Sequence, residues 1–482
     1  MPGGELSGGG RIGGLVVGTA AMAIMLLLPA PVGMPAEAWR VAAVAVLMAS
    51  WWISEAAPLP ATALAPIVLF PLLGIAPLAE AAAPYADPVM FLFLGGFVLG
   101  IGLERRSLHK RAGLRAILLV GTSPRRLIGG FLLATATLSM WVSNSATAVI
   151  MLPVATAVLG LFASHCRADR VSQRNLGTAV MLAVAYGASI GGLGTLIGTP
   201  PNALLAAYME REHGVTIGFA QWMLIGLPMV FAMIAVTWPL LVRLHPISTA
   251  AVDAGPAIRA ELDALGPPGP AERRVAAVFV ATALAWVTRP LYGTYVPGLD
   301  DSVIAVIGAL CLFVVPSGQG DGERLIAWED TRALPWGILV LFGGGLSLAG
   351  AISSSGLAAW LGSAMSQLGS LPVLAVLFAA TLGMIFLTEL TSNTASAATF
   401  LPVGGAVALG IGIEPAMLAV PLALAASCAF MLPVATPPNA IVFAGGLVTI
   451  GQMARVGLWI NLLGAVVIVA LSYLFAGILF GR

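Results

Sequence analysis

The sequence predicts an all-α polytopic membrane protein with eleven transmembrane helices and two re-entrant hairpins, arranged in two inverted repeats. Its 482 residues are 59% hydrophobic and only 9% charged, with a mean hydropathy of +1.00, whereas a soluble domain carries about 25% charged residues. One pair of polar motifs also occurs twice: SNSATAVIMLPV from Ser143 precedes GTPPNA, and SNTASAATFLPV from Ser392 precedes ATPPNA. Duplicated polar segments with Gly and Pro, inside an apolar chain, are typical of transporters built from two repeats.

Apolar windows of about 20 residues, the length needed to cross a bilayer, predict the spans. The first lies within residues 1–37 and is expected to be retained, although the run up to a weak Ala36-Glu37-Ala38 site also resembles a signal peptide. Spans 177–209 and 415–446 each contain a Pro-Pro pair and are expected to be broken helices. The other spans are expected near 38–54, 58–75, 89–104, 219–242, 274–290, 302–316, 334–352 and 455–480.

Two stretches, 127–163 and 371–411, are expected to be re-entrant hairpins. Basic residues flank the first on both sides, which places both of its ends in the cytoplasm. Two helices of about 17 residues would each reach only about 25 Å, short of the ~30 Å hydrocarbon core. The second hairpin has flanks with few charges, as expected outside, and an odd number of spans separates the two. The hairpins therefore open to opposite faces.

This topology gives a first repeat at 38–243, a flexible cytoplasmic linker at 244–273 and an inverted second repeat at 274–482. The protein would lie in the cell (inner) membrane, with its N-terminus in the cytoplasm and its C-terminus outside. The bilayer is thus its first expected partner.

The duplicated motifs suit a small anion and a small cation. Pro200-Pro201 and Pro437-Pro438 remove amide donors and interrupt the helix, so that helix N-termini carrying about half a positive charge face the breaks. The amides of Asn144 and Asn393, with nearby hydroxyls, can bond carboxylate or sulfate oxygens, and the unwound carbonyls can bind sodium. Glu389, the one acid within a hairpin, is expected to brace hairpin backbone amides, with a proton site as the alternative.

Other classes of function fit the sequence poorly. The net charge of +1 suggests no nucleic-acid partner, and three scattered cysteines without CxxC spacing disfavour a disulfide framework or a thiolate metal site. An intramembrane serine hydrolase needs a base, but the four histidines all fall in polar connections. The chain is therefore not expected to be an enzyme. An anion channel would not need two pseudo-symmetric sites.

With these motifs the sequence resembles the divalent anion:sodium symporter family, whose members move dicarboxylates, citrate or sulfate. Two Ser-Asn-Thr hairpin tips mark that family, and here they stand as Ser143-Asn144-Ser145 and Ser392-Asn393-Thr394. The stretch ASCAFMLPVATPPNAIV, from Ala426 to Val442, is similar to the family's signature in its second broken helix. The resemblance implies a homodimer in which a fixed scaffold domain supports a transport domain that carries the site across the membrane, an elevator motion.

The resemblance also implies the residues of the site. It places a first sodium ion on Ser139, Ser143, Asn144 and the backbone of Gly198, with Gly192 as an alternative to Gly198, and a second on Thr388, Thr391, Asn393 and the backbone of Ala435. Substrate would contact Asn144, Ser145, Asn393, Thr394, Thr436 and Pro437, and the repeat-equivalent Thr199 and Pro200 join this set.

The expected function is secondary active transport that couples inward movement of Na⁺, the co-transported ion, to uptake of a C4-dicarboxylate such as succinate or malate. Ser145 stands where the family usually has Thr, so the hydroxyl is kept but a methyl is lost. The choice of anion therefore stays open. The alternatives are a sodium-independent dicarboxylate or citrate exchanger and a sodium/sulfate symporter.

Overall fold

The computed structural model describes residues 8–165, 170–247, 255–320 and 322–480. Within these ranges the regular elements are helices, and no strand occurs beyond one isolated bridge. The all-α prediction is therefore confirmed for the described part of the chain. Residues 1–7 of the predicted first span, 248–254 of the predicted linker and 481–482 at the predicted outer end lie outside the described residues.

Seven helices in the described ranges are long and apolar enough to cross a membrane, and shorter apolar helices accompany them. This confirms a multi-pass membrane protein, whereas the count of eleven spans and the domain boundaries stay predictions. The seven cover Ala36–Ile53, Leu78–Arg105, Val171–Gly192, Phe219–Leu244, Pro270–Tyr292, Trp336–Ser354 and Ile450–Phe475.

The first half of the chain extends from α1 to α12. The predicted span 58–75 is interrupted and forms two short helices, α3 and α4, the second of which has Pro66 in its first turn. The elements are α1 Gly8–Leu27, α2 Ala36–Ile53, α3 Leu59–Thr62, α4 Ala65–Leu72, α5 Leu78–Ala82, η1 Ala83–Ala86, α6 Pro88–Arg105, α7 Leu108–Val120, α8 Pro124–Ser139, α9 Asn144–His165, α10 Arg170–Gly192, α11 Pro200–His213 and α12 Phe219–Leu244.

The second half follows a similar order. A helix pair stands in the place of each predicted hairpin, α8–α9 in the first half and α18–α19 in the second. Its elements are α13 Gly255–Ala264, α14 Pro270–Tyr292, α15 Asp301–Val314, η2 Trp328–Ala333, α16 Trp336–Ser354, α17 Leu357–Ala364, η3 Ser366–Ser370, α18 Val373–Thr388, α19 Asn393–Gly410, α20 Pro415–Ala426, α21 Pro437–Ala444 and α22 Ile450–Phe480.

The stretch expected to be a flexible linker, 244–273, contains ordered helix. It includes α13, and α14 begins at Pro270, before the predicted 274. Lys110 Nζ of α7 lies 3.0 Å from Glu261 of α13, and Arg111 of α7 pairs with Glu272 of α14 at 2.5 Å between Nε and Oε1. Because the Arg111 side chain is almost fully buried, this ion pair anchors the connection to α7.

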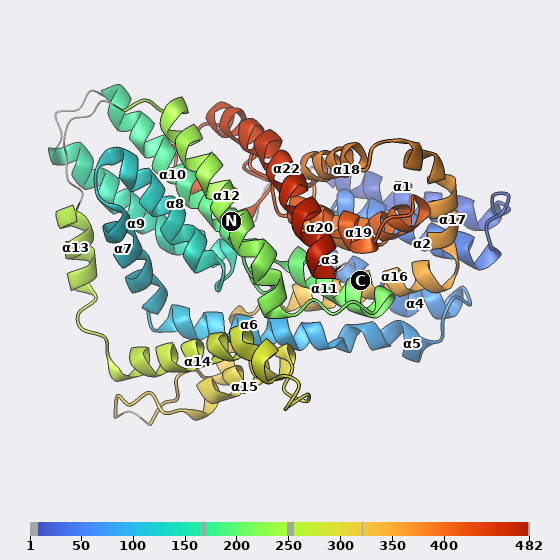
Figure 1. The fold of residues 1–482 in the computed structure, drawn as a ribbon, viewed down its shortest axis with the longest axis horizontal. Coiled ribbons are helices and arrows are strands. Elements are labelled where there is room, and N and C mark those ends of the chain that lie inside the picture. The colour runs from blue at the N-terminus through green and yellow to red at the C-terminus, as the bar shows by residue number, and fades with distance from the viewer. Residues whose placement is uncertain (1–7, 166–169, 248–254, 321, 481–482) are drawn as a thin grey trace.

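The helices form two groups that pack against each other through α12 and α22 and through α10 and α21. Figure 1 shows α8, α9, α10 and α12 side by side in one group, and α18, α19, α20 and α22 in the other. Helix α10 is central, with 94% of its apolar window buried, whereas α14 is peripheral, with 17% buried. The core therefore surrounds the broken helices rather than the flanking spans.

Close approaches between helices occur at glycines in both halves. A Cβ on Gly226 of α12 would lie 2.6 Å from the carbonyl oxygen of Gly194, and a Cβ on Gly457 of α22 would lie 2.2 Å from that of Phe430. Since real Cβ atoms do not approach this closely, only glycine fits at either position. Helices α12 and α22 thus lie directly against the non-helical segments after α10 and α20.

Candidate functional site

The two hairpin tips have the same local hydrogen bond. Oγ of Ser139, the last residue of α8, is hydrogen-bonded to the side-chain amide of Asn144, the first residue of α9, at 2.7 Å. Thr388, the last residue of α18, donates through Oγ1 to Oδ1 of Asn393, the first residue of α19, also at 2.7 Å. In each pair the residues are five apart. The hydroxyl therefore fixes the asparagine where the chain reverses.

The Asn144 amide faces a group of oxygens. One of its terminal atoms lies 2.7 Å from Ser139 Oγ, 3.1 Å from the Ala188 carbonyl and 3.2 Å from the Gly198 carbonyl. A nitrogen in this position would donate to all three. An oxygen there would complete a cluster of hard oxygen ligands, the environment that unwound carbonyls and side-chain oxygens offer to sodium.

The same geometry separates the two glycine candidates for a sodium ligand. The Gly198 carbonyl faces the Asn144 amide, whereas the Gly192 carbonyl accepts a hydrogen bond from Nδ2 of Asn202 at 2.9 Å. Gly192 has a different role, because a Cβ there would lie 2.9 Å from Asn144 Oδ1. The carbonyl at Gly198 is the one available to the Asn144 cluster.

Both predicted broken helices are interrupted at their Pro-Pro motifs. The chain is non-helical over 193–199, between α10 and α11, and over 427–436, between α20 and α21. Thr199 and Thr436 precede the two prolines with extended backbone, at φ −147°, ψ 144° and φ −142°, ψ 148°. This is the conformation that a following proline favours, so the sequence itself dictates where each new helix begins.

An asparagine after each Pro-Pro pair clamps the break, a role that the sequence analysis did not assign. Asn202 donates through Nδ2 to the carbonyls of Gly192 (2.9 Å) and Thr195 (2.8 Å). Asn439 donates to the carbonyls ten and seven residues before it, at 3.2 and 3.0 Å, and Asn202 has the same spacing. The signal that could have found them is their place in both PPNA motifs.

Hydrogen bonds join the two halves at the breaks. Thr199 Oγ1 lies 3.2 Å from Ser427 Oγ, although 228 residues separate them in the chain. The Thr388 hydroxyl, besides contacting Asn393, donates to the Ala426 carbonyl at 2.9 Å. The first tip therefore contacts the first break, the first break contacts the second, and the second contacts the other tip.

The predicted site residues differ in exposure. The Thr391 hydroxyl donates to the Leu387 carbonyl at 2.9 Å and lies 2.6 Å from Ser396 Oγ. Residues predicted to hold sodium are mostly buried and those predicted to contact substrate mostly partly exposed. Buried are Ser139, Gly198, Thr199, Thr388, Thr391, Ala435 and Thr436; partly exposed are Asn144, Ser145, Pro200, Asn393 and Thr394; exposed are Ser143 and Pro437.

A cavity of about 110 Å³ adjoins the first hairpin tip. Trp141, Ser143 and Ile197 line it from the tip and the first break, and Gly96 and Glu104 line it from α6. The tip residue Ser143 therefore borders open space.

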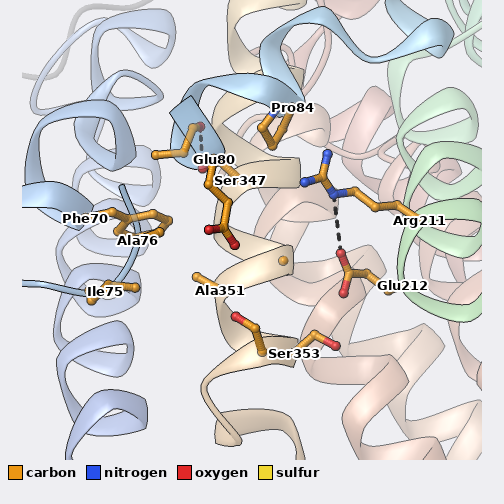
Figure 2. Close-up of a pocket in the computed structure, with 13 residues that line it drawn as sticks. Phe70, Ile75, Ala76, Glu80, Pro84, Arg211, Glu212, Ser347, Ala351 and Ser353 are labelled. Carbon is orange, nitrogen blue, oxygen red and sulfur yellow. Dashed lines mark hydrogen bonds and ion pairs between the residues drawn. The ribbon is translucent and has the colours of Figure 1, made fainter. Parts of the chain in front are cut away.

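A larger cavity of about 440 Å³ lies elsewhere, between α5, α16 and the end of α11 (Figure 2). Arg211 and Glu212, 3.6 Å apart, face Glu80 and Ser353 across it. None of the predicted site residues lines this cavity.

Glu389 makes different contacts from those expected. Its Oε1 accepts from the backbone amides of Phe430 (2.7 Å) and Met431 (2.9 Å) and from Nδ2 of Asn461 (2.7 Å), and its Oε2 accepts from the amide of Leu432 (3.0 Å). Its expected role as an acceptor for backbone amides is present. The amides belong to the second break, however, and not to the hairpin.

Comparisons with known proteins give the family that this chain matches. The family described as the sodium:sulfate symporter transmembrane region matches residues 11–481. A sodium-dependent dicarboxylate transporter, SdcS, of Staphylococcus saprophyticus is 40% identical over 96% of this chain and 91% of its own. The protein of the same name from Staphylococcus aureus is 39% identical over 98% of this chain and 92% of its own.

The fold resembles the crystal structure of the Alcanivorax borkumensis YdaH transporter, with a TM-score of 0.54 over 85% of this chain and 88% of that one. At 17% identity this likeness extends to the fold alone. Family membership rests instead on the match along almost the whole sequence. The chain belongs to the sodium:sulfate symporter family, the divalent anion:sodium symporters, and is a transporter rather than an enzyme.

Proposed function

We propose that this protein couples inward movement of sodium to uptake of a divalent anion, most simply a C4-dicarboxylate such as succinate or malate. The observation that carries the proposal is the continuous set of contacts from Asn144 through the two breaks to Asn393. Relatives that are about 40% identical are named sodium-dependent dicarboxylate transporters, which favours dicarboxylate over the sulfate of the family description.

The first sodium ion is assigned to Ser139, Ser143, Asn144 and the Gly198 carbonyl, and the second to Thr388, Thr391, Asn393 and the Ala435 carbonyl. The oxygens around Asn144 support the first assignment. The matching contact between Thr388 and Asn393 supports the second.

Substrate is assigned to the surface between the tips and the breaks. Four helices begin there, at Asn144, Pro200, Asn393 and Pro437, and their N-terminal amides and dipoles attract an anion without a lysine or arginine. The assigned residues are Asn144, Ser145, Thr199, Pro200, Asn393, Thr394, Thr436 and Pro437.

The two halves are proposed to be inverted repeats, with α8–α12 and α18–α22 forming the transport domain of an elevator and the flanking helices forming the scaffold. Two contacts support a sliding boundary. Gly96 of α6 faces Ile197, and Gly345 of α16 faces Ala398 of α19. Small and apolar surfaces can shift past each other without breaking hydrogen bonds. The cavity beside Ser143, bounded by Glu104 near the basic cytoplasmic flank, fits a site open to the inside. The homodimer implied by the family resemblance belongs to the same proposal.

Radiolabelled succinate uptake into proteoliposomes tests the function. A sodium gradient directed inward, compared with choline, should drive uptake that does not need succinate inside. Uptake that ignores sodium but requires internal succinate would make the protein an exchanger. Unlabelled malate should compete and sulfate should not. Competition by sulfate alone would reverse the assignment of substrate.

A further inference from the structure

The two breaks differ in how their backbone amides are bonded. In the first, the amides of Leu193 and Gly194 donate to carbonyls three residues earlier, at 3.1 and 2.9 Å. In the second, the amides of Ser427 and Cys428 make the same kind of local bond, at 3.2 and 2.9 Å. Three further successive amides, at 430–432, donate to the Glu389 carboxylate. A local turn thus opens both breaks, and a side chain from another segment holds the rest of the second.

The length of the second break explains this difference. Helix α20 ends at Ala426, and its clamp residue is Asn439, whereas α10 ends at Gly192 with its clamp at Asn202. The second helix therefore unwinds about one turn earlier. Amides freed by unwinding need other acceptors when they are buried.

Glu389 supplies acceptors for these amides, and hydrogen bonds occupy all of the acceptor positions of its carboxylate. An ionised carboxylate offers about four acceptor positions, and the three amides and Asn461 of α22 occupy that many. The residue is 3% exposed, and a buried charge is tolerated only when hydrogen bonds replace its water. One side chain thus joins the second hairpin, the second break and α22.

These contacts converge on the proposed second sodium site from both sides. Thr388, the residue before Glu389, contacts Asn393 and the Ala426 carbonyl. On the other side, the amide of Ala435 donates to the carbonyl of Leu432 at 3.2 Å, and Leu432 is the residue whose amide Glu389 holds.

The structure assigns Glu389 a positioning role: it fixes the second break against the second hairpin, so that the second cation site is formed before the cation binds. The assignment rests on the proposed function. Glu389 acts through Thr388 and the 430–432 backbone, and its negative charge adds attraction for a cation. Met140 follows Ser139 in the first tip, so the position that matches Glu389 carries no carboxylate there.

Two substitutions separate geometry from charge. Glu389→Gln keeps the shape but turns an amide NH₂ toward backbone N–H groups, and Glu389→Asp keeps the charge but is one methylene too short. Both should raise the half-saturating sodium concentration about tenfold or more, as loss of an outer-shell partner does at metal sites. The KM for succinate at saturating sodium should change little. Glu414→Gln, at the exposed N-cap of α20, is the matched control.

Sodium binding is read without transport, as thermal stabilisation of the purified protein by sodium relative to choline. Asn461→Val leaves the carboxylate with its three amides and should shift the sodium titration by less than the Glu389 variants. If the two Glu389 variants do not fold, Asn461→Val serves as the test in their place. A wild-type sodium titration for Asn461→Val would then overturn the assignment.

The outcomes are distinct. Weaker sodium binding in both Glu389 variants supports the positioning role. A wild-type titration in Glu389→Gln overturns it, as does a wild-type titration in Glu389→Asp alone, because charge without geometry would then suffice. Wild-type protein that shows neither sodium stabilisation nor sodium-driven uptake would overturn the proposed function itself.

Discussion

Replacing Asn202 with alanine should loosen the first break by an amount that its contacts define. The fully buried side chain donates to two buried carbonyls. Without this donor the Gly192 carbonyl loses the hydrogen bond from Asn202, which costs about 1–3 kcal/mol for a buried acceptor. The Thr195 carbonyl keeps a 3.3 Å bond from the Gly198 amide, so its loss is nearer to about 0.5–1.5 kcal/mol. The sum is about 1.5–4.5 kcal/mol.

The assay is the fraction of purified protein that stays monodisperse after heating, measured by fluorescence-detected size exclusion. Asn175→Ala is the control, since it removes one amide-to-carbonyl bond, to Pro246 at 2.8 Å, in an exposed setting. Asn202→Ala should unfold at a clearly lower temperature than this control. Asn439→Ala should fall between them, because Glu389 also holds its break. An Asn202→Ala protein as heat-stable as Asn175→Ala would refute the clamp.

Three further outcomes are expected. Gly192→Ala should abolish sodium-dependent uptake, because its Cβ would lie 2.9 Å from Asn144 Oδ1. Gly160→Ala is the control and should transport normally, since the space around Gly160 is open. Equal uptake by both variants would contradict the geometry of the first tip. Gly457→Ala should lower the yield of folded protein, since its Cβ would lie 2.2 Å from the Phe430 carbonyl, and wild-type yield and heat stability would argue against that close approach. We also expect at least three sodium ions per dianion, because the two ions at the assigned sites would only neutralise it. Collapsing a 100 mV potential should then slow uptake, since each net charge is worth about 2.3 kcal/mol at that potential; uptake that ignores the potential would mean neutral coupling.

Much of the fold can be predicted from the sequence because the bilayer leaves few options. Apolar windows locate the helices, and Pro-Pro pairs locate the breaks: α11 and α21 begin at Pro200 and Pro437, as a proline in the first turn requires. The helix pairs α8–α9 and α18–α19 fall within a few residues of the predicted 127–163 and 371–411. That each pair re-enters the membrane stays a prediction, which rests on the short length of both pairs and on the basic flanks of the first. Family membership could be inferred because the tips Ser143-Asn144-Ser145 and Ser392-Asn393-Thr394 resemble those that mark the family.

The parts that could not be predicted depend on partners distant in sequence. The backbone amides that donate to Glu389 lie more than 40 residues away, on a break whose early unwinding no local pattern marks. Asn202 and Asn439 recur in both PPNA motifs, but the motif alone does not indicate which carbonyls they bond. Helix α13 was missed because Pro and Gly surround it within 244–273, and its ion pair with Lys110 is a tertiary contact.

The most direct test of the central claim, that both hairpin tips form one site for sodium and anion, is sodium-driven succinate uptake by Asn144→Ala and Asn393→Ala proteins. Asn175→Ala, on the same reconstituted amount of folded protein, is the control. Each tip variant should lose uptake while the control keeps it, because each asparagine is assigned to both a sodium ion and the substrate. Near-wild-type uptake by either tip variant would contradict the claim.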